Sequence, residues 1–257
     1  NPFYLGKMEL IRIDNLCKRF GSKTVHEDVS FSVNKGECIG LLGGSGTGKS
    51  VILRSMIGLE KIDSGQITIE GIVITNFNER ELLDVRRRVA YAFQGGALFD
   101  SMTVFDNLAY TLREHTTLSE PEIYKKVIKT LGDFDLKGNE ALLPASLSGG
   151  MQKRVGLARA IISEPDIILY DEPTAGLDPY NTRVIQDTIL RLKATGVTSI
   201  LVTHDMPSAL AVCDRIMMLM DGRIVATATP AEVHSQSSGV IKNFMAGLHQ
   251  NRQKDRR

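Results

Sequence analysis

The sequence contains little cysteine and no surplus of charge of either sign. Three cysteines occur in 257 residues, namely Cys17, Cys38 and Cys213. Their odd number, wide spacing and apolar neighbours are typical of reduced thiols in a core, and they argue against a disulfide framework or a cysteine-bound metal. The 31 basic and 30 acidic residues leave a net charge of +1, so no global field favours nucleic acid or an anionic membrane surface.

Long apolar runs, internal repeats and low-complexity linkers are also missing from the sequence. The longest strongly apolar stretches, such as Ile216 to Met220, fall far short of the ~20 residues that a membrane-spanning helix requires. Asn1 to Lys7 lack the apolar core of a signal peptide, although a chain that begins with asparagine need not include its native start. If the protein works at a membrane, we expect another chain to provide the span.

The first part of the chain has strand patterns followed by a loop and a helix. Short runs with β-type alternation at residues 10–13 and 29–33 predict an antiparallel β lobe. A buried strand at 38–42, a glycine-rich loop and a helix over about 49–58 follow them. This is the order of elements that a P-loop fold requires.

The middle of the chain carries helical spacing, and strand patterns resume after it. Helices are predicted at 104–113, 120–131, 149–162, 179–194, 206–213 and 231–248, and further strands at 89–93, 167–170, 198–202, 216–220 and 223–226. We therefore predict one α/β domain over residues 1–257. It has a helical subdomain inserted at roughly 95–165, C-terminal helices within 231–248 and a basic tail at 249–257.

The strongest motif is the run Gly43-Gly44-Ser45-Gly46-Thr47-Gly48-Lys49-Ser50, which matches the pattern G-x-x-x-x-G-K-[ST]. Glycines at these positions let backbone N–H groups turn inward around phosphate oxygens. Lys49 then reaches the β and γ phosphates, and Ser50 can ligate Mg²⁺. The strand before the run and the helix after it favour a nucleotide-binding loop over a merely flexible glycine turn.

A pair of carboxylates follows the buried strand pattern Ile167 to Tyr170. Asp171 is placed to hold Mg²⁺ through water, and Glu172 is placed to orient or deprotonate the attacking water, because phosphoryl transfer depends mostly on positioning and charge stabilisation. Taken alone, such a pair is more often a strand end near a turn. The phosphate loop upstream reverses that preference.

A second anion-binding pattern lies in Leu147-Ser148-Gly149-Gly150-Met151-Gln152. Ser148 caps a predicted helix that begins Gly149-Gly150, so the helix dipole, N–H groups and a hydroxyl converge on an anion. In isolation these residues would be only an N-cap. With the loop and the carboxylates, the run resembles the signature of the ATP-binding cassette (ABC) family, most commonly Leu-Ser-Gly-Gly-Gln, here with Met before the Gln.

The resemblance to the ABC family covers about residues 10–248 and includes its motifs in order. Ala175-Gly176-Leu177-Asp178 resembles the D-loop, Gln94 resembles the Q-loop glutamine that contacts Mg²⁺ or water, and His204 resembles the histidine that senses the γ phosphate. The family's fold is a P-loop NTPase, ABC-type nucleotide-binding domain with an antiparallel β lobe and an inserted α-helical subdomain. The resemblance therefore implies ATP and Mg²⁺ as the cofactors of this chain.

The resemblance also implies individual roles. It implies catalytic roles for Lys49, Gln94, Glu172 and His204. It implies ATP contacts for Phe20, Gly43, Gly44, Ser45, Gly46, Thr47, Gly48, Lys49, Ser50 and Val51. The implied Mg²⁺ ligands are Ser50, Gln94 and, through water, Asp171. Phe20 lies where the family stacks an aromatic ring on adenine, although an aromatic residue between strands is as often core. Val51 replaces the hydroxyl residue of many relatives, so we expect a weaker α-phosphate contact without loss of activity.

In ABC domains two copies face head to tail, and this implies a homodimer. Ser148, Gly149 and Gly150 would contact the ATP of the partner copy in trans, and Asp178 would lie at the dimer interface. Because the catalytic residues are retained, both sites of a homodimer should hydrolyse ATP. A lone monomer should bind ATP and barely hydrolyse it.

The segment from Gln94 to Leu108, followed by Leu112 to Thr116, resembles the ATPase subunits of Mla-type systems, which move phospholipids between the inner and outer membranes of Gram-negative bacteria, and of their actinobacterial and plastid relatives. In ABC domains this segment faces the transmembrane permease. The resemblance implies a peripheral subunit on the cytoplasmic face of the inner membrane, with accessory subunits and a lipid-binding component. Alternatively, the apolar residues of this segment are simply the packed face of a helical subdomain, and the chain serves another ABC importer or exporter.

Two further alternatives come from other classes. A soluble ABC protein acting on ribosomes or DNA usually has two cassettes or a long coiled-coil insert, and this near-neutral chain has neither. A regulatory binder that holds nucleotide without turnover is contradicted by Glu172 and His204. The basic tail at 249–257 is either solvated or an arm that grips a partner or anionic lipid heads. We expect no nucleic acid partner.

Overall fold

The computed structural model describes residues 8–235 and 239–245, which form two compact units. The first unit falls within the ranges Asn1–Asn76 and Leu201–Arg257, and the second is Phe77–Ile200. The basic tail at 249–257, the start of the chain and part of the predicted C-terminal helices lie outside the described residues. None of the helices within the described residues is long and apolar enough to cross a bilayer. The single-domain boundaries and the limits of the helical subdomain stay predictions.

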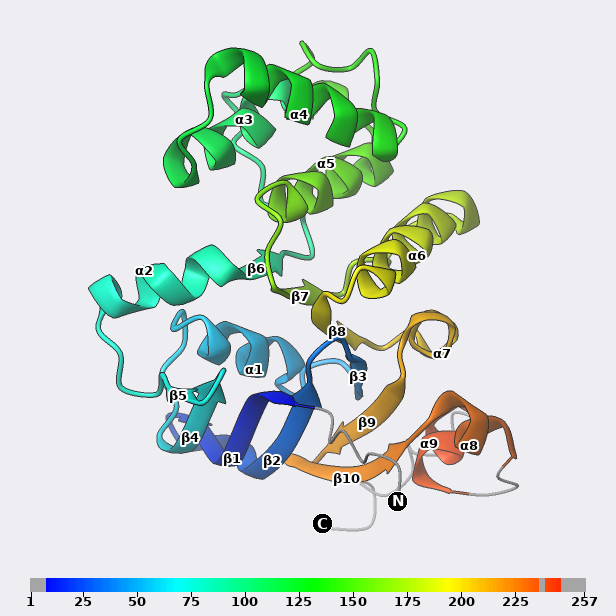
Figure 1. Cartoon of the computed structure of the whole chain (residues 1–257). Coiled ribbons are helices and arrows are strands. Elements are labelled where there is room, and N and C mark those ends of the chain that lie inside the picture. Colours follow the sequence, from blue (N-terminus) through cyan, green and yellow to red (C-terminus); the bar gives the residue numbers. More distant parts are fainter. Residues whose placement is uncertain (1–7, 236–238, 246–257) are drawn as a thin grey trace, which may run out of the picture. The chain divides into compact units, whose positions relative to one another are not determined.

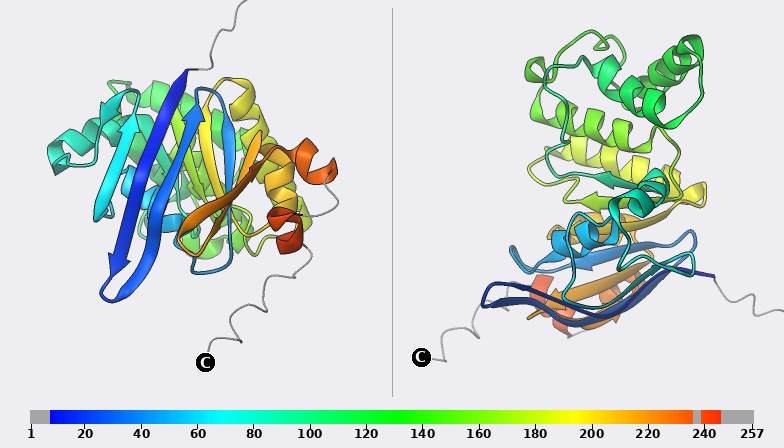
Figure 2. Two further views of the ribbon diagram at one scale, coloured as in Figure 1. Left: turned by 90° about the horizontal axis from the view of Figure 1, so that it is seen from below. Right: turned by 90° about the vertical axis from the view of Figure 1, so that its left-hand side faces the viewer.

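The first unit contains a four-stranded antiparallel sheet of order β2-β1-β4-β5. Its strands are β1 (Glu9–Phe20), β2 (Lys23–Asn34), β4 (Ser64–Ile69) and β5 (Ile72–Val73). Alternating apolar residues of β1, such as Ile11 and Ile13, are fully buried, as expected for a sheet with one face on a core. The long β1–β2 hairpin is seen in both views of Figure 2. The predicted antiparallel β lobe is confirmed.

The first unit also contains a parallel pair, β3 (Cys38–Leu42) and β9 (Arg215–Met220), to which β10 (Arg223–Ala228) adds an antiparallel edge. Every residue of β3 is buried, which fits a strand covered on both faces. Its helices are α1 (Lys49–Met56), α7 (Met206–Val212), α8 (Pro230–Ser235) and α9 (Val240–Met245). Figure 1 labels these elements. No disulfide joins the three cysteines, all of which are described.

The second unit contains the parallel pair β6 (Val89–Ala92) and β7 (Ile167–Asp171). Its helices are α2 (Glu79–Arg88), α3 (Val104–His115), α4 (Glu120–Asp133), α5 (Gly149–Ile161) and α6 (Pro179–Ala194), with a short 3₁₀ turn at Pro144–Ser146. The fully buried strand β8 (Thr198–Thr203) runs across the division between the units. The helices α3, α4 and α5 pack on one another through buried apolar faces (Figure 1).

The sequence patterns left α2, β4 and β5 unpredicted. In α2 only Leu82 is buried, so the helix has no apolar stripe to reveal it. Its start is fixed instead by a capping box in which Asn78 accepts from the N–H of Glu81 and the Glu81 carboxylate accepts from the N–H of Asn78. Polar capping, rather than burial, therefore defines this helix.

Candidate nucleotide-binding site

The glycine loop of the first unit connects the buried strand β3 to α1. Gly43 must be glycine because a Cβ there would lie 2.6 Å from the carbonyl oxygen of Leu219. Gly48 is the N-cap of α1 and has a left-handed backbone, with φ of 91°. A Cβ on Gly48 would lie 2.4 Å from Val25 Cγ1 and 2.5 Å from His26 Nε2. The motif glycines thus allow close backbone packing as well as left-handed turns.

The Lys49 side chain lies inside the loop and is 6% exposed. Its ammonium donates to the carbonyl oxygens of Gly43 at 3.0 Å and Gly44 at 2.9 Å. The Thr47 hydroxyl donates to the same Gly44 carbonyl at 3.0 Å. These contacts hold a positive charge against the loop, where a phosphate group would meet it.

The start of α1 fits an anion. Its N-cap is glycine, so no side chain caps the first turn, and that turn contains no acidic residue. The helix dipole places partial positive charge at such an end, which favours phosphate. The loop therefore combines a helix N-terminus, the Lys49 ammonium and a glycine cradle that a Cβ would obstruct. These are the features that bind the phosphates of a nucleotide.

Two other predicted residues lie in the first unit. Phe20 ends β1, and its ring is 45% exposed with the Lys18 ammonium 4.7 Å from its centroid. The ring is therefore available to a ligand and is not a core residue, while its contact with adenine stays a prediction. His204 is exposed and directly follows β8.

The two carboxylates of the second unit lie where β7 ends. Asp171 is the last residue of β7, and Asp171 and Glu172 are 8% and 9% exposed. The hydroxyl of Tyr91 on β6 donates to Asp171 Oδ2 at 2.7 Å, which fixes one carboxylate oxygen. Glu172 has a left-handed backbone with φ of 49°, a conformation that residues other than glycine rarely adopt and that concentrates at functional sites.

The exposed residue Gln94 begins a loop that lies against α5 in the second unit. A Cβ on Gly156 of α5 would lie 2.4 Å from the Cα of Gly96, so the two backbones are in close contact. The guanidinium of Arg159 donates to the Ala97 carbonyl at 2.8 Å. The segment that follows Gln94 therefore packs against α5 and is hydrogen-bonded to it.

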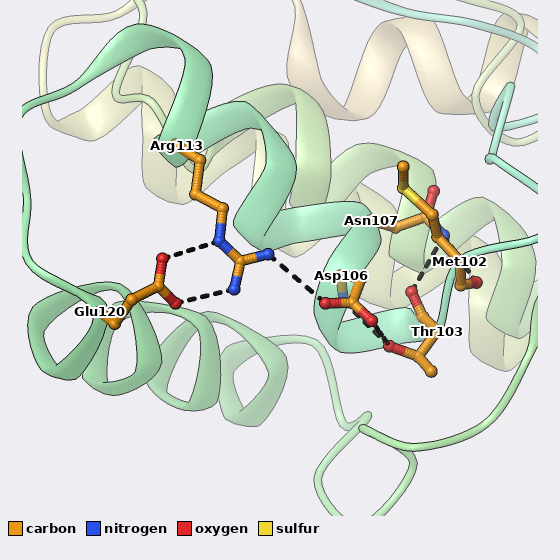
Figure 3. A network of polar contacts seen from close by, with 6 residues as sticks. All are labelled: Met102, Thr103, Asp106, Asn107, Arg113 and Glu120. Atoms are coloured by element: carbon orange, nitrogen blue, oxygen red, sulfur yellow. Dashed lines mark hydrogen bonds and ion pairs between the residues drawn. The ribbon is translucent and has the colours of Figure 1, made fainter.

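The same segment is also fastened to α3 through Asn107, which is fully buried. Its Oδ1 accepts from the Phe99 N–H at 2.9 Å, and its Nδ2 donates to the carbonyl of Met102 at 3.1 Å and of Thr103 at 3.0 Å. Figure 3 shows Asn107 facing Met102 and Thr103. The Asn107 amide thus provides hydrogen-bond partners for backbone groups of the turn before α3.

The exposed side of α3 is joined to α4 by ion pairs. Arg113 binds both carboxylate oxygens of Glu120, at 2.8 and 2.7 Å, and contacts Asp106 at 3.5 Å (Figure 3). Hydrogen bonding from Arg113 lowers the pKa of Glu120. Asp106 also accepts from the Thr103 hydroxyl, which itself caps α3. These contacts link the start of α3 to α4.

The predicted signature residues form a helix start. Ser148 is the N-cap of α5, and its hydroxyl accepts from the Met151 N–H at 3.3 Å. The first turn of α5 carries no acidic residue, which leaves it suited to an anion. A Cβ on Gly150 would lie 2.7 Å from Asn181 Nδ2. The N-cap prediction is confirmed, and the contact with a second ATP stays a prediction.

Asp178, the predicted interface residue, caps α6. Its Oδ1 accepts from the Asn181 N–H at 3.0 Å, and this hydrogen bonding lowers the pKa of the Asp178 carboxyl. The Lys153 ammonium of α5 donates to the Ala175 carbonyl. The signature helix and the loop before α6 are therefore joined within the second unit.

The donor set fits Mg²⁺ in its chemistry. Ser50, Asp171 and Gln94 offer hydroxyl, carboxylate and amide oxygens, the hard ligands that Mg²⁺ prefers. No group of three or more His, Cys, Asp or Glu residues that could hold a metal occurs among the described residues.

Sequence patterns missed two residues that support these groups. Tyr91 was part of an unremarkable strand pattern, and nothing in that pattern showed that its hydroxyl contacts Asp171. His26 lies on β2, and its Nε2 is 3.1 Å from the Gly48 carbonyl oxygen. No sequence pattern pointed to it, because His26 precedes the strand predicted at 29–33.

Comparisons with known proteins agree with this geometry. Residues 26–175 match the family model described as ABC transporter. The intermembrane phospholipid transport system ATP-binding protein MlaF of Haemophilus influenzae is 37% identical over 93% of this chain and 90% of its own length, and MlaF of Escherichia coli is 38% identical over 89% and 85%. The probable ribonucleotide transport ATP-binding protein mkl of Mycobacterium tuberculosis is 41% identical over 92% of this chain. This chain spans 66% of that relative's length.

Solved structures give the same result. The ATP-binding cassette MJ0796, in a dimeric post-hydrolysis state bound to ADP and Pi, aligns with a TM-score of 0.81 and 29% identity over 86% of this chain and 99% of its own. The cbiO1 protein from Clostridium perfringens aligns with a TM-score of 0.79 and 26% identity over 93% and 95%. The chain belongs to the ABC transporter family and has the fold of its ATP-binding cassette.

Proposed function

We propose that this chain is the ATP-binding and hydrolysing subunit of a membrane ABC transporter. The observation that carries the proposal is the glycine loop, which brings the Lys49 ammonium together with a helix start that has no side-chain cap. The cassette MJ0796, which shares the fold, is described as bound to ADP and Pi. The loop from Gly43 to Val51 would hold ATP, with Phe20 against the adenine.

The catalytic roles follow from the chemistry of each side chain. The Lys49 charge stabilises negative charge on the phosphates, and His204 contacts the γ phosphate. Glu172 orients or deprotonates the attacking water. Ser50, Gln94 and Asp171 would hold Mg²⁺, which when bound neutralises charge that develops on the phosphoryl oxygens.

Two copies of the chain would form the working ATPase. The proposal is supported by the α5 helix start, which is suited to an anion, and by the dimeric cassette MJ0796. Ser148, Gly149 and Gly150 of one copy would contact ATP held by the other, with Asp178 at the interface. ATP hydrolysis should therefore depend on protein concentration.

The transported substrate that we favour is phospholipid, moved between the inner and outer membranes of a Gram-negative bacterium. Two relatives at 37 and 38% identity are named for intermembrane phospholipid transport. The segment from Gln94 to Leu108 would contact the permease. The subunit would lie peripherally on the cytoplasmic face of the inner membrane, with accessory and lipid-binding subunits and no nucleic acid partner.

A second candidate substrate comes from the mycobacterial relatives, which are named for probable ribonucleotide transport and are 41% identical to this chain. The two candidates share the ATPase and differ in the permease. Purifying the chain with its native membrane partners and analysing the bound molecules separates them. Co-purified phospholipid supports the first candidate. Because ATP is itself a ribonucleotide, the second is supported only by a complex without phospholipid whose membrane subunits bind a ribonucleotide.

The ATPase itself is tested by Glu172→Gln. Loss of general-base assistance should lower turnover by at least ~10²-fold while ATP binding persists. Glu164→Gln is the matched control, because Glu164 is also in the left-handed region, with φ of 56°, but its exposed side chain pairs with Lys126. Phosphate release by Glu172→Gln at the rate of Glu164→Gln would overturn the role of Glu172.

A further inference from the structure

A buried histidine lies directly beneath the glycine loop of the first unit. His26 is on β2 and is fully buried. Its Nε2 lies 3.1 Å from the carbonyl oxygen of Gly48, the N-cap of α1. The same carbonyl accepts from the N–H of Val51 at 2.9 Å, as the first hydrogen bond of the helix. The carbonyl also accepts from the N–H of Ile52 at 3.3 Å, so His26 adds a third donor to the oxygen on which α1 begins.

The partners of the ring settle its tautomer. A carbonyl oxygen only accepts, so the proton of the neutral ring must be on Nε2. Nδ1 is buried and has no hydrogen-bond partner in the described part of the chain. Burial lowers the pKa of His26, and the charge of Lys18 lowers it further, against the opposing effect of the Gly48 carbonyl. The ring is thus a neutral donor at neutral pH.

The hydrogen bond from His26 to the Gly48 carbonyl also affects the next N–H group, because of the geometry of a peptide group. The C=O of Gly48 and the N–H of Lys49 belong to one planar trans peptide and point in opposite directions. Fixing the carbonyl toward β2 and α1 therefore aims the Lys49 N–H away from the helix, toward the region where an anion binds a helix N-terminus. The contact is tight, because a Cβ on Gly48 would lie 2.5 Å from His26 Nε2.

We propose that His26 is a positioning residue of the phosphate loop: its Nε2–H holds the Gly48–Lys49 peptide in the orientation that binds nucleotide phosphate. The inference rests on the proposed ATP-binding function of the loop. A plain core residue would only need to fill the space under Gly48. A positioning residue must also supply the donor, and this difference is what an experiment can separate.

The test compares His26→Leu with His26→Gln in the full chain. Leucine fills the space without a donor, whereas the glutamine amide places an N–H near the position of Nε2. We expect His26→Leu to weaken ADP and ATP binding about tenfold, the size expected for one lost hydrogen bond. His26→Gln should stay within about threefold of wild type. Because the interaction acts on bound nucleotide before hydrolysis, KM should rise in His26→Leu with kcat little changed.

Ser55→Ala is the matched control for a lost buried hydrogen bond on α1. The Ser55 hydroxyl donates to the Val51 carbonyl at 2.9 Å, one turn after the loop. The change should lower the melting temperature of the nucleotide-free protein and leave nucleotide affinity unchanged. Isothermal titration calorimetry and circular dichroism of the same samples check affinity and folding together.

Two outcomes would overturn the inference. One is wild-type affinity in a folded His26→Leu protein, and the other is equal loss in His26→Leu and His26→Gln. If His26→Leu is not folded, the comparison of His26→Gln with His26→Asn decides, because the shorter amide cannot reach Gly48 and should lose affinity. Failure of the wild-type chain to bind ATP at all would instead refute the proposed function, so the two failures are distinguishable.

Discussion

The glycine loop of the first unit and the carboxylate group of the second unit are built in different ways. The loop is made by backbone: glycines at left-handed φ, a helix start without a side-chain cap, and a lysine bonded to loop carbonyls. In the carboxylate group, a side chain instead holds Asp171, through the hydroxyl of Tyr91. A Cβ at Gly43 or Gly48 would collide with neighbouring atoms, whereas a side-chain site loses one contact at a time. Substitutions in the two groups should therefore differ in severity.

The largest effect is expected for Gly48→Ala. The new Cβ would meet Val25 and His26 at about 2.5 Å, and the residue would also have to adopt a φ of 91°. Left-handed strain and overpacking together should cost about 2–4 kcal/mol of stability and weaken ATP binding at least ~10²-fold, since 1.4 kcal/mol is about a factor of ten. Thermal melting and nucleotide titration measure both effects.

Gly21→Ala is the control that separates strain from collision. Gly21 has a similar left-handed φ of 59°, but nothing lies within 4 Å of a Cβ there. This variant should lose only about 1 kcal/mol and keep wild-type affinity for ATP. Equal losses in the two variants would show that close packing under the loop contributes nothing.

Next in size is Ser148→Ala. Removing the N-cap of α5 should cost about 1 kcal/mol of stability, and removing the hydroxyl from the proposed trans contact with phosphate should lower turnover roughly tenfold or more. Asn78→Ala removes the cap of α2 in the same unit. This variant should lose about as much stability as Ser148→Ala and leave turnover unchanged. If both variants hydrolyse ATP equally, Ser148 is only a cap.

How far the sequence predicts this molecule depends on what kind of contact defines each part. β3 and α6 were predicted residue for residue, because each leaves a local pattern in the sequence. β3 is a run of apolar residues, and α6 lies between Asp178-Pro179 and Gly196. The loop was predicted because its glycines are required by backbone geometry. The contacts of His26 and Tyr91 join residues 22 and 80 positions apart, and such pairing depends on strand register. A single sequence does not show that register.

The smallest effect, and the sharpest test of the side-chain site, is expected for Tyr91→Phe. The change removes only the hydroxyl that donates to Asp171 Oδ2 at 2.7 Å. Outer partners of metal ligands typically contribute 10–100-fold to metal affinity, and because Asp171 would hold Mg²⁺ through water we expect the lower end, about tenfold. The readout is the affinity of the ATP complex for Mn²⁺ by electron paramagnetic resonance, with ATP affinity in the absence of metal unchanged. Tyr124→Phe, on the exposed face of α4, should change neither value. Weaker metal-free ATP binding in Tyr91→Phe would mean that the hydroxyl supports the fold around β6 and β7 rather than the orientation of the carboxylate.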